Sequence, residues 1–116
     1  MILHICRTGD WTPGAAYRPE SLDTVGFVHC ADPGTVHLPA DRLFRGQPDL
    51  LLLCVDPARL TVPVRWEEGD PPDPGGVRFP HVYGPIDPEA VVSAHPFPPA
   101  ADGTFHLPPE LAATHS

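Results

Sequence analysis

The six residues Leu50–Val55, LLLLCV, form the longest apolar run in the sequence. A strand that is apolar on both faces belongs in the interior of a sheet. The run is far too short to span a bilayer, which takes about 20 apolar residues. We therefore predict a buried central strand here and no association with a membrane.

Other strand-like segments on both sides of this strand predict the rest of the sheet. They are Met1–Cys6, Val25–Cys30, Val62–Glu67, Val77–Tyr83 and Ala90–His95. Two short helices are predicted in the N-terminal half, one capped by Thr8 or Asp10 and one over about Pro33–Arg45, and residues 17–22 are predicted as an extended loop. Because the strands are short, most connections are tight and helical crossovers for a parallel sheet are absent, we expect an α+β fold with a mostly antiparallel sheet.

Composition limits the partners. The chain has 116 residues, enough for one domain, and its net charge is −8 with seven arginines and no lysine. A protein that binds duplex nucleic acid needs a basic surface, so we do not expect duplex DNA or RNA as a partner. A nucleotide or another small molecule remains compatible, because a few arginines and backbone amides can hold it.

The cysteines and the N-terminus indicate the cellular compartment of the protein, and the C-terminal composition indicates how well that end is ordered. Cys6, Cys30 and Cys54 each lie in an apolar segment without CxxC spacing, which is typical of reduced, buried thiols. The first residues lack the features of a secretory signal, so we predict a cytoplasmic protein. We expect one domain over residues 1–97 and a loosely ordered, proline-rich tail over 98–116.

Three histidines fall in predicted strands and invite a shared site. They are His4 in ILHIC, His29 in GFVHCA and His81 in FPHVYGP. Imidazole titrates near neutral pH, so such a cluster can orient a hydroxyl group or carry a proton. Side chains alternate along a strand, which places Tyr83 on the same face as His81. Each histidine can also be a buried structural donor, and this alternative stays open.

The same histidines and the cysteines beside them could in principle bind a metal ion or form a thiol nucleophile. His4, His29, His81 and the neighbouring thiols offer zinc ligands, although their spacing is not that of a usual zinc site, and we predict no metal. Cys30 as a nucleophile would need a histidine from another strand, because His29 points to the opposite face. Packing is the favoured interpretation for Cys30.

A carboxylate and an arginine complete the candidate residues. Glu67 follows Trp66 near the end of the segment VPVRWEE, and functional carboxylates often occur at the end of a strand. Arg18 lies in the predicted loop near Ser21 and is our preferred binder of a phosphate or carboxylate. The sequence contains no glycine-rich phosphate loop and no GxSxG elbow.

The order of four segments resembles a known family. The four segments are ILHIC with a following DW, SLDTVGFVHCA, the RLFRGQPDLLLLCVDPARL block with VRWE, and FPHVYGPI. Together they look like the bacterial and plant family called domain of unknown function 952. The resemblance covers about residues 1–95. It implies a fold similar to the ADP-ribosyltransferases, in which a split antiparallel sheet holds NAD in a cleft.

The resemblance also implies roles for individual residues. His4 corresponds to the first-strand residue that contacts the ribose, and Glu67 or His29 would stabilise the charge that develops as the glycosidic bond breaks. His81 would share the catalytic cleft. Ala31 stands where relatives commonly carry serine, a departure from the pattern.

The candidate cofactor contacts come from other positions. Arg18 and Ser21 would bind the nucleotide, while Phe27 and Tyr83 would pack against it. From the sequence we therefore expect an ADP-ribosyltransferase-like enzyme that acts on NAD or a related nucleotide. The alternatives are a non-catalytic module that binds a small molecule in the same cleft, and a tailoring enzyme of specialised metabolism.

Overall fold

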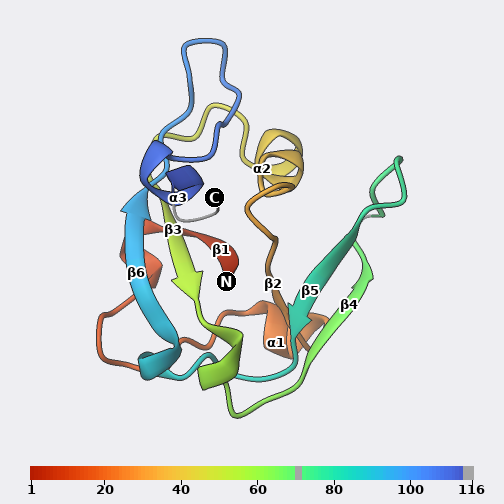
Figure 1. Ribbon diagram of the computed structural model, residues 1–116, viewed down its shortest axis with the longest axis vertical. Helices are drawn as coiled ribbons and strands as arrows, with labels where there is room; N and C mark the ends of the chain where they lie inside the picture. The colour runs from red at the N-terminus through yellow and green to blue at the C-terminus, as the bar shows by residue number, and fades with distance from the viewer. Residues whose placement is uncertain (70–71, 114–116) are drawn as a thin grey trace.

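The computed structural model describes residues 1–69 and 72–113 and contains two three-stranded antiparallel sheets. The first sheet has the order β1 (Ile2–Arg7), β3 (Leu50–Val55), β6 (Val91–Pro96). The second has the order β2 (Val28–His29), β5 (Arg78–Val82), β4 (Val64–Glu68). The expectation of a small α+β fold with antiparallel strands is thus confirmed. Figure 1 shows β3 and β6 on one side of the molecule and β4 and β5 on the other.

β3 is the central strand of the first sheet, with the bounds predicted from its sequence. It pairs with β1 on one side and β6 on the other. Its side chains enter two separate apolar clusters, because Leu52 belongs to one cluster and Leu53 and Val55 to the other. A strand that is apolar throughout can bury both of its faces in this way.

The two sheets meet where β1 passes the end of β2. Leu3 and Ala31 form an isolated antiparallel bridge in which each amide donates to the other carbonyl at 2.7 Å. One residue earlier, the Cys30 amide donates to Pro80 O of β5 at 3.1 Å. The segment after β2 is therefore hydrogen-bonded to both sheets, and it brings the side chains of β1 close to those of β2 and β5.

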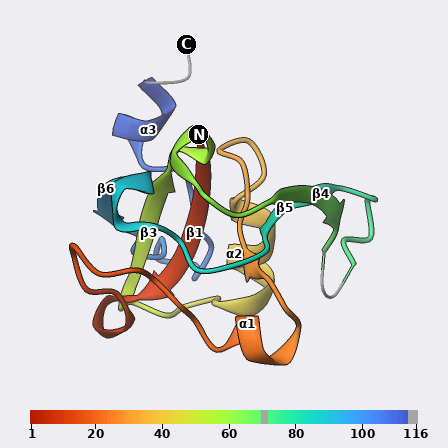
Figure 2. The same cartoon turned by 90° about the horizontal axis from the view of Figure 1, so that it is seen from below.

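The helices are short, which fits a chain with 18 prolines and 10 glycines. α2 (His37–Leu43) begins later and ends earlier than the predicted helix, and residues Thr8–Asp10 form one turn of 3₁₀ helix. Two more 3₁₀ turns cover Pro57–Arg59 and Pro88–Ala90. In the view of Figure 2, α1 and α2 lie between the first sheet and the β4–β5 pair. None of the helices among the described residues has the length and apolar character needed to cross a membrane.

α1 (Ser21–Thr24) corrects the prediction of an extended loop over residues 17–22. Its single turn ends at Gly26, which has a φ of 88° and donates its amide to Ser21 O at 3.0 Å. Glycine adopts this left-handed conformation at low cost, which makes it the common residue after a helix end. The same turn also shortens β2, which starts three residues later than predicted.

The C-terminal segment packs against the domain, so the expectation of a loosely ordered tail over 98–116 is wrong for its described part. Phe105 is 1% exposed, Leu111 is 7% exposed, and both belong to the cluster that contains Leu52. α3 (Pro109–Ala113) carries Leu111 into this core. Phe97 stacks at a tilt on Phe105 with 4.9 Å between ring centroids. The apolar residues in this stretch are spaced too widely to predict an element, yet they are enough to anchor it.

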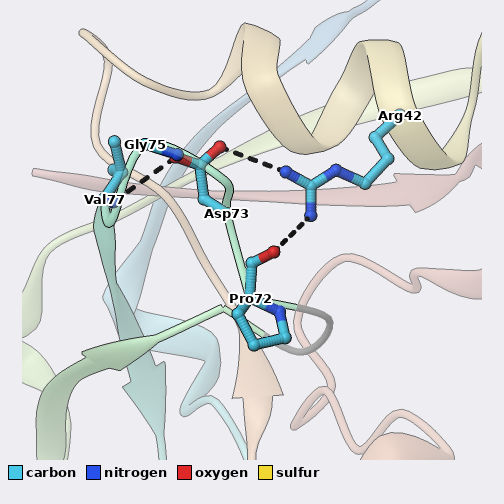
Figure 3. A network of polar contacts seen from close by, with 5 residues as sticks. All are labelled: Arg42, Pro72, Asp73, Gly75 and Val77. Carbon is cyan, nitrogen blue, oxygen red and sulfur yellow. Dashed lines mark hydrogen bonds and ion pairs between the residues drawn. The ribbon is translucent and has the colours of Figure 1, made fainter.

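The loop between β4 and β5 is fastened to α2 by one carboxylate (Figure 3). The side chain of Asp73 is 8% exposed and forms an ion pair with Arg42 Nη2 at 3.1 Å. It also accepts hydrogen bonds from the amides of Gly75 at 2.8 Å and Val77 at 3.4 Å. Arg42 donates in addition to Pro72 O at 3.3 Å.

This network predicts a measurable loss of stability for Asp73→Ala. The substitution leaves two loop amides and the Arg42 guanidinium without their carboxylate, so we expect the free energy of unfolding to fall by about 1–3 kcal/mol. Urea denaturation at pH 7 measures it. Asp23→Ala is the matched control, because it removes an ion pair with Arg18 whose side chains are both more than half exposed, and exposed pairs contribute little. Equal losses in the two variants would contradict this role for Asp73.

Candidate functional site

A cavity of about 420 Å³ opens where the two sheets meet, and it is called the main cavity below. His4 from β1, His29 from β2 and His81 from β5 all line it. The structure thus brings together the three histidines that the sequence singled out. The volume is within the range of small-molecule sites, roughly 300–1,000 Å³.

His4 is held at both ring nitrogens by the protein itself. Its Nδ1 lies 2.5 Å from His29 O, and its Nε2 lies 2.8 Å from Tyr17 Oη. A carbonyl oxygen can only accept, so Nδ1 carries the hydrogen. Burial lowers the pKa of His4 to about 4. The hydrogen bond to the His29 carbonyl has the opposite but smaller effect on this pKa. His4 is therefore neutral at pH 7, and its Nε2 accepts the hydroxyl hydrogen of Tyr17.

This arrangement revises the expected role of His4. The resemblance implied that His4 hydrogen-bonds a ribose hydroxyl, but both of its nitrogens already have partners in the protein. The geometry favours His4 as a positioning residue that fixes Tyr17 and the main chain at His29. Tyr17 is 7% exposed and also lines the main cavity.

A second hydrogen-bonded group centres on Glu67. Its Oε1 accepts from Tyr83 Oη at 2.5 Å and lies 3.0 Å from His81 Nδ1. These hydrogen bonds, first that of Tyr83 and then that of His81, lower the pKa of the Glu67 carboxyl. The hydrogen bond to the carboxylate also raises the pKa of Tyr83. Both donors use Oε1, and no described residue hydrogen-bonds Oε2.

Strand register explains why these side chains meet. Glu67 pairs with Phe79 and Arg65 pairs with His81, so Glu67 lies diagonally across from the histidine on the same face of the β4–β5 pair. His29 pairs directly with His81 and places its ring on that face too, with 5.8 Å between ring centroids. The alternation of side chains along a strand indicates which face of the sheet a residue lies on. Which residue it meets on the next strand depends on the register between the two strands.

His81 has one nitrogen left for chemistry. Its side chain is 3% exposed, and Nδ1 points at the Glu67 carboxylate. No described residue hydrogen-bonds Nε2, and the His81 side chain lines the main cavity. A neutral imidazole that donates through Nδ1 has its lone pair on Nε2, as the histidine of a catalytic triad does.

A second, more open hollow of about 400 Å³ adjoins the first and is called the side hollow below. Phe27, Glu67 and Tyr83 are among its lining residues, and Gly69 and His81 line both spaces. Phe27 stacks on His81 with a centroid distance of 3.9 Å and an interplanar angle of 16°. His81 therefore lies at the junction of the two spaces, and the Glu67 carboxylate, which is hydrogen-bonded to it, lines the side hollow.

Gly84 helps to place Tyr83 beside Glu67. A Cβ atom at position 84 would lie 2.5 Å from Val62 Cγ1, so no larger residue fits while this segment keeps its path. The Tyr83 amide donates to Pro63 O at 2.9 Å, next to that contact. The glycine of FPHVYGP thus lets the chain after β5 lie close against the segment before β4.

The structure places Ser21 and Arg18, the two polar residues expected to bind a nucleotide, in different surroundings. Ser21 lines the main cavity. Arg18 lines neither space and forms an exposed ion pair with Asp23 at 3.1 Å. The prediction that Arg18 binds a phosphate therefore finds no support in the geometry. The arginines at the main cavity are instead Arg7 and Arg42.

The cysteines behave as packing residues. Cys6, Cys30 and Cys54 are all buried free thiols. Burial raises the pKa of Cys30 to about 12, so its thiolate is scarce at neutral pH and the nucleophile alternative loses its basis. Within the described residues no group of three histidine, cysteine or acidic side chains is arranged to hold a metal ion.

Two contributors to the site were missed from the sequence. Tyr17 was assigned to a loop, yet its main chain bridges to Ile86 and its hydroxyl reaches His4. Asp10 lines the main cavity from the first 3₁₀ turn. No local pattern marks either residue, because both reach the site through contacts between segments far apart in the sequence.

Comparisons with known proteins place the chain in a family. Residues 5–94 match the family model described as "Protein of unknown function (DUF952)". The crystal structure of protein CC0527 from Caulobacter crescentus is similar, with 29% identity, a TM-score of 0.80, and coverage of 96% of this chain and 97% of that one. Its solution NMR structure matches with 29% identity, a TM-score of 0.71 and 89% coverage of both chains. No curated protein matches the chain. The chain belongs to the DUF952 family.

Proposed function

We propose that this protein is an enzyme that transfers the glycosyl group of NAD or a related nucleotide, in the manner of an ADP-ribosyltransferase. The observation that carries the proposal is the Glu67 carboxylate in the side hollow, whose Oε1 is fixed by Tyr83 and His81 and whose Oε2 has no described partner, next to the point where His81 joins the side hollow to the main cavity. A substrate made of two parts could place one part in each space, with the bond that reacts lying between them.

The proposed reaction uses both Glu67 and His81. The bond between ribose C1′ and the nicotinamide nitrogen breaks, and its electron pair neutralises the pyridinium ring. The Glu67 carboxylate stabilises the oxocarbenium-like charge left on the ribose, as carboxylates do in glycoside hydrolysis. The acceptor oxygen or nitrogen bonds to C1′ and gives its proton to His81 Nε2, because Nδ1 is held by Glu67.

The two spaces support such a substrate by their size and lining. Each holds about 400 Å³, and together they suit a dinucleotide better than a single ring. Phe27 and Tyr83 supply aromatic surface in the side hollow, and Arg78 adds a positive charge there. The split arrangement of two antiparallel sheets is also what the resemblance to the ADP-ribosyltransferase fold implies.

A second candidate is a module that binds a small metabolite without chemistry. The hydrogen bonds of His4 favour it, because the protein satisfies both ring nitrogens and leaves a rigid, preformed wall. In a tailoring enzyme of specialised metabolism, the third possibility, His81 Nε2 would act on a different substrate in the same cavity.

Incubation with NAD separates these candidates. We expect free nicotinamide to accumulate, measured by chromatography, and calorimetry to show NAD binding under the same conditions. Binding of NAD without release of nicotinamide would replace the proposal with the binding module. Neither binding nor release would contradict a role in NAD chemistry altogether.

A further inference from the structure

The hydroxyl of Tyr17 has a fixed polarity in the main cavity. Since His29 O can only accept, His4 must donate through Nδ1, and the bare Nε2 takes the hydrogen of Tyr17 Oη at 2.8 Å. A hydroxyl group has one hydrogen and two lone pairs. Once that hydrogen is committed to His4, Tyr17 can offer a ligand only a hydrogen-bond acceptor.

The surroundings of Tyr17 reinforce this polarity. Burial raises the pKa of Tyr17, and the nearby Asp10 carboxylate raises it further. Asp10 lines the same cavity. A ligand group placed beside Tyr17 Oη therefore meets acceptors and negative potential, which attract a donor and repel a carboxylate.

We propose that Tyr17 is a specificity-determining residue, and that the main cavity selects the part of the ligand that presents an N–H or O–H donor to Tyr17 Oη. The inference rests on the proposed function for the identity of that part. In NAD the matching group is the carboxamide of nicotinamide, whose N–H₂ would donate to Tyr17. A nucleotide with a carboxylate or a ketone at that position lacks the donor.

Other groups at the cavity agree with this selection. His81 Nε2 carries a lone pair in the neutral form and is a second acceptor. The Arg42 guanidinium, which could attract a carboxylate, is already engaged with Asp73 and Pro72 O. Arg7 lines the same cavity from the exposed end of β1.

Three pyridines of nearly equal shape test the selection on the unmodified protein. Nicotinamide and thionicotinamide carry the N–H₂ donor, whereas 3-acetylpyridine is neutral and replaces it with a methyl group. Dissociation constants come from NMR titration of the protein. We expect 3-acetylpyridine to bind about 10-fold more weakly than the two amides, because it leaves the Tyr17 acceptor without a partner. Nicotinate, which adds a negative charge, should bind at least as weakly as 3-acetylpyridine.

The Tyr17→Phe substitution should remove the discrimination. In this variant nicotinamide and 3-acetylpyridine should bind within about twofold of each other. Tyr83→Phe makes the same chemical change in the side hollow, and it should keep the wild-type ratio between the two ligands whatever it does to their affinities. If Tyr17→Phe does not fold, the ligand series on the unmodified protein decides alone.

Failure of this inference is distinguishable from failure of the proposed function. Equal affinity for nicotinamide and 3-acetylpyridine, with NAD still bound and cleaved, would overturn the role of Tyr17 and leave the proposed function standing. No binding of NAD or of any pyridine would overturn both. Tighter binding of nicotinate than of nicotinamide would show that the cavity presents a donor or a cation, contrary to the inference.

Discussion

Glu67→Gln is expected to lower the rate of nicotinamide release from NAD by roughly 10²–10³-fold, the usual effect of removing one electrostatic contact from a transition state. Glutamine keeps the size of the side chain and an oxygen that can accept from Tyr83 and His81, so the local geometry should survive. What it removes is the negative charge that opposes the developing positive charge on the ribose. The loss should appear mainly in kcat, since that charge forms only during reaction.

Initial rates at saturating NAD, together with thermal melting curves, measure this effect. Glu89→Gln is the matched control, because it makes the same change at an exposed residue that lines neither the main cavity nor the side hollow. The control should keep the wild-type rate. A Glu67→Gln protein that folds normally and turns over NAD at the wild-type rate would remove Glu67 from the mechanism.

The contribution of His4 to the free energy of unfolding is expected to fall by about 3 kcal/mol as the pH drops from 7 to 4. Burial lowers the pKa of His4 from 6.5 to about 4 in the folded protein. Between these two values the unfolded chain binds a proton at His4 that the folded chain does not, so acid favours unfolding. The stabilisation is complete above pH 6.5 and is lost as the pH falls toward 4. It amounts to about 1.4 kcal/mol for each pH unit between the pKa of the unfolded chain and that of the folded protein.

Urea denaturation at several pH values between 7 and 4.5 measures the slope. His4→Asn removes the titrating group while keeping an N–H that can donate to His29 O, so its free energy of unfolding should depend less steeply on pH. His37→Asn, at an exposed histidine in α2, should keep the wild-type slope. Equal slopes for wild type and His4→Asn would show that the His4 ring is not buried in its neutral form.

The strands were the most predictable part of the fold. β3 has the predicted bounds because an apolar run between Asp49 and Asp56 has few other ways to bury all its side chains. α1 was missed because Pro19 favours an extended chain, and Gly26, the signal that ends the helix, was overlooked. The tail was missed because Phe105 is isolated in sequence and becomes part of the core only through tertiary packing.

The site was predictable as a set of residue types and not as a set of contacts. Alternation along strands placed His81 and Tyr83 on one face, and the structure agrees. The hydrogen bonds of both to Glu67 depend on the β4–β5 register, which no local pattern encodes. Likewise, the use of both His4 nitrogens depends on Tyr17, whose main chain forms an isolated bridge with Ile86 from a segment outside the strands.

A crystal structure with carba-NAD, an analogue whose glycosidic bond cannot be cleaved, tests the central claim most directly. We predict that the nicotinamide ring occupies the main cavity beside Tyr17 and that the ribose lies at the junction, within hydrogen-bond distance of Glu67 Oε2 and facing His81 Nε2. An analogue bound elsewhere on the molecule, with the junction of the two spaces empty, would contradict it.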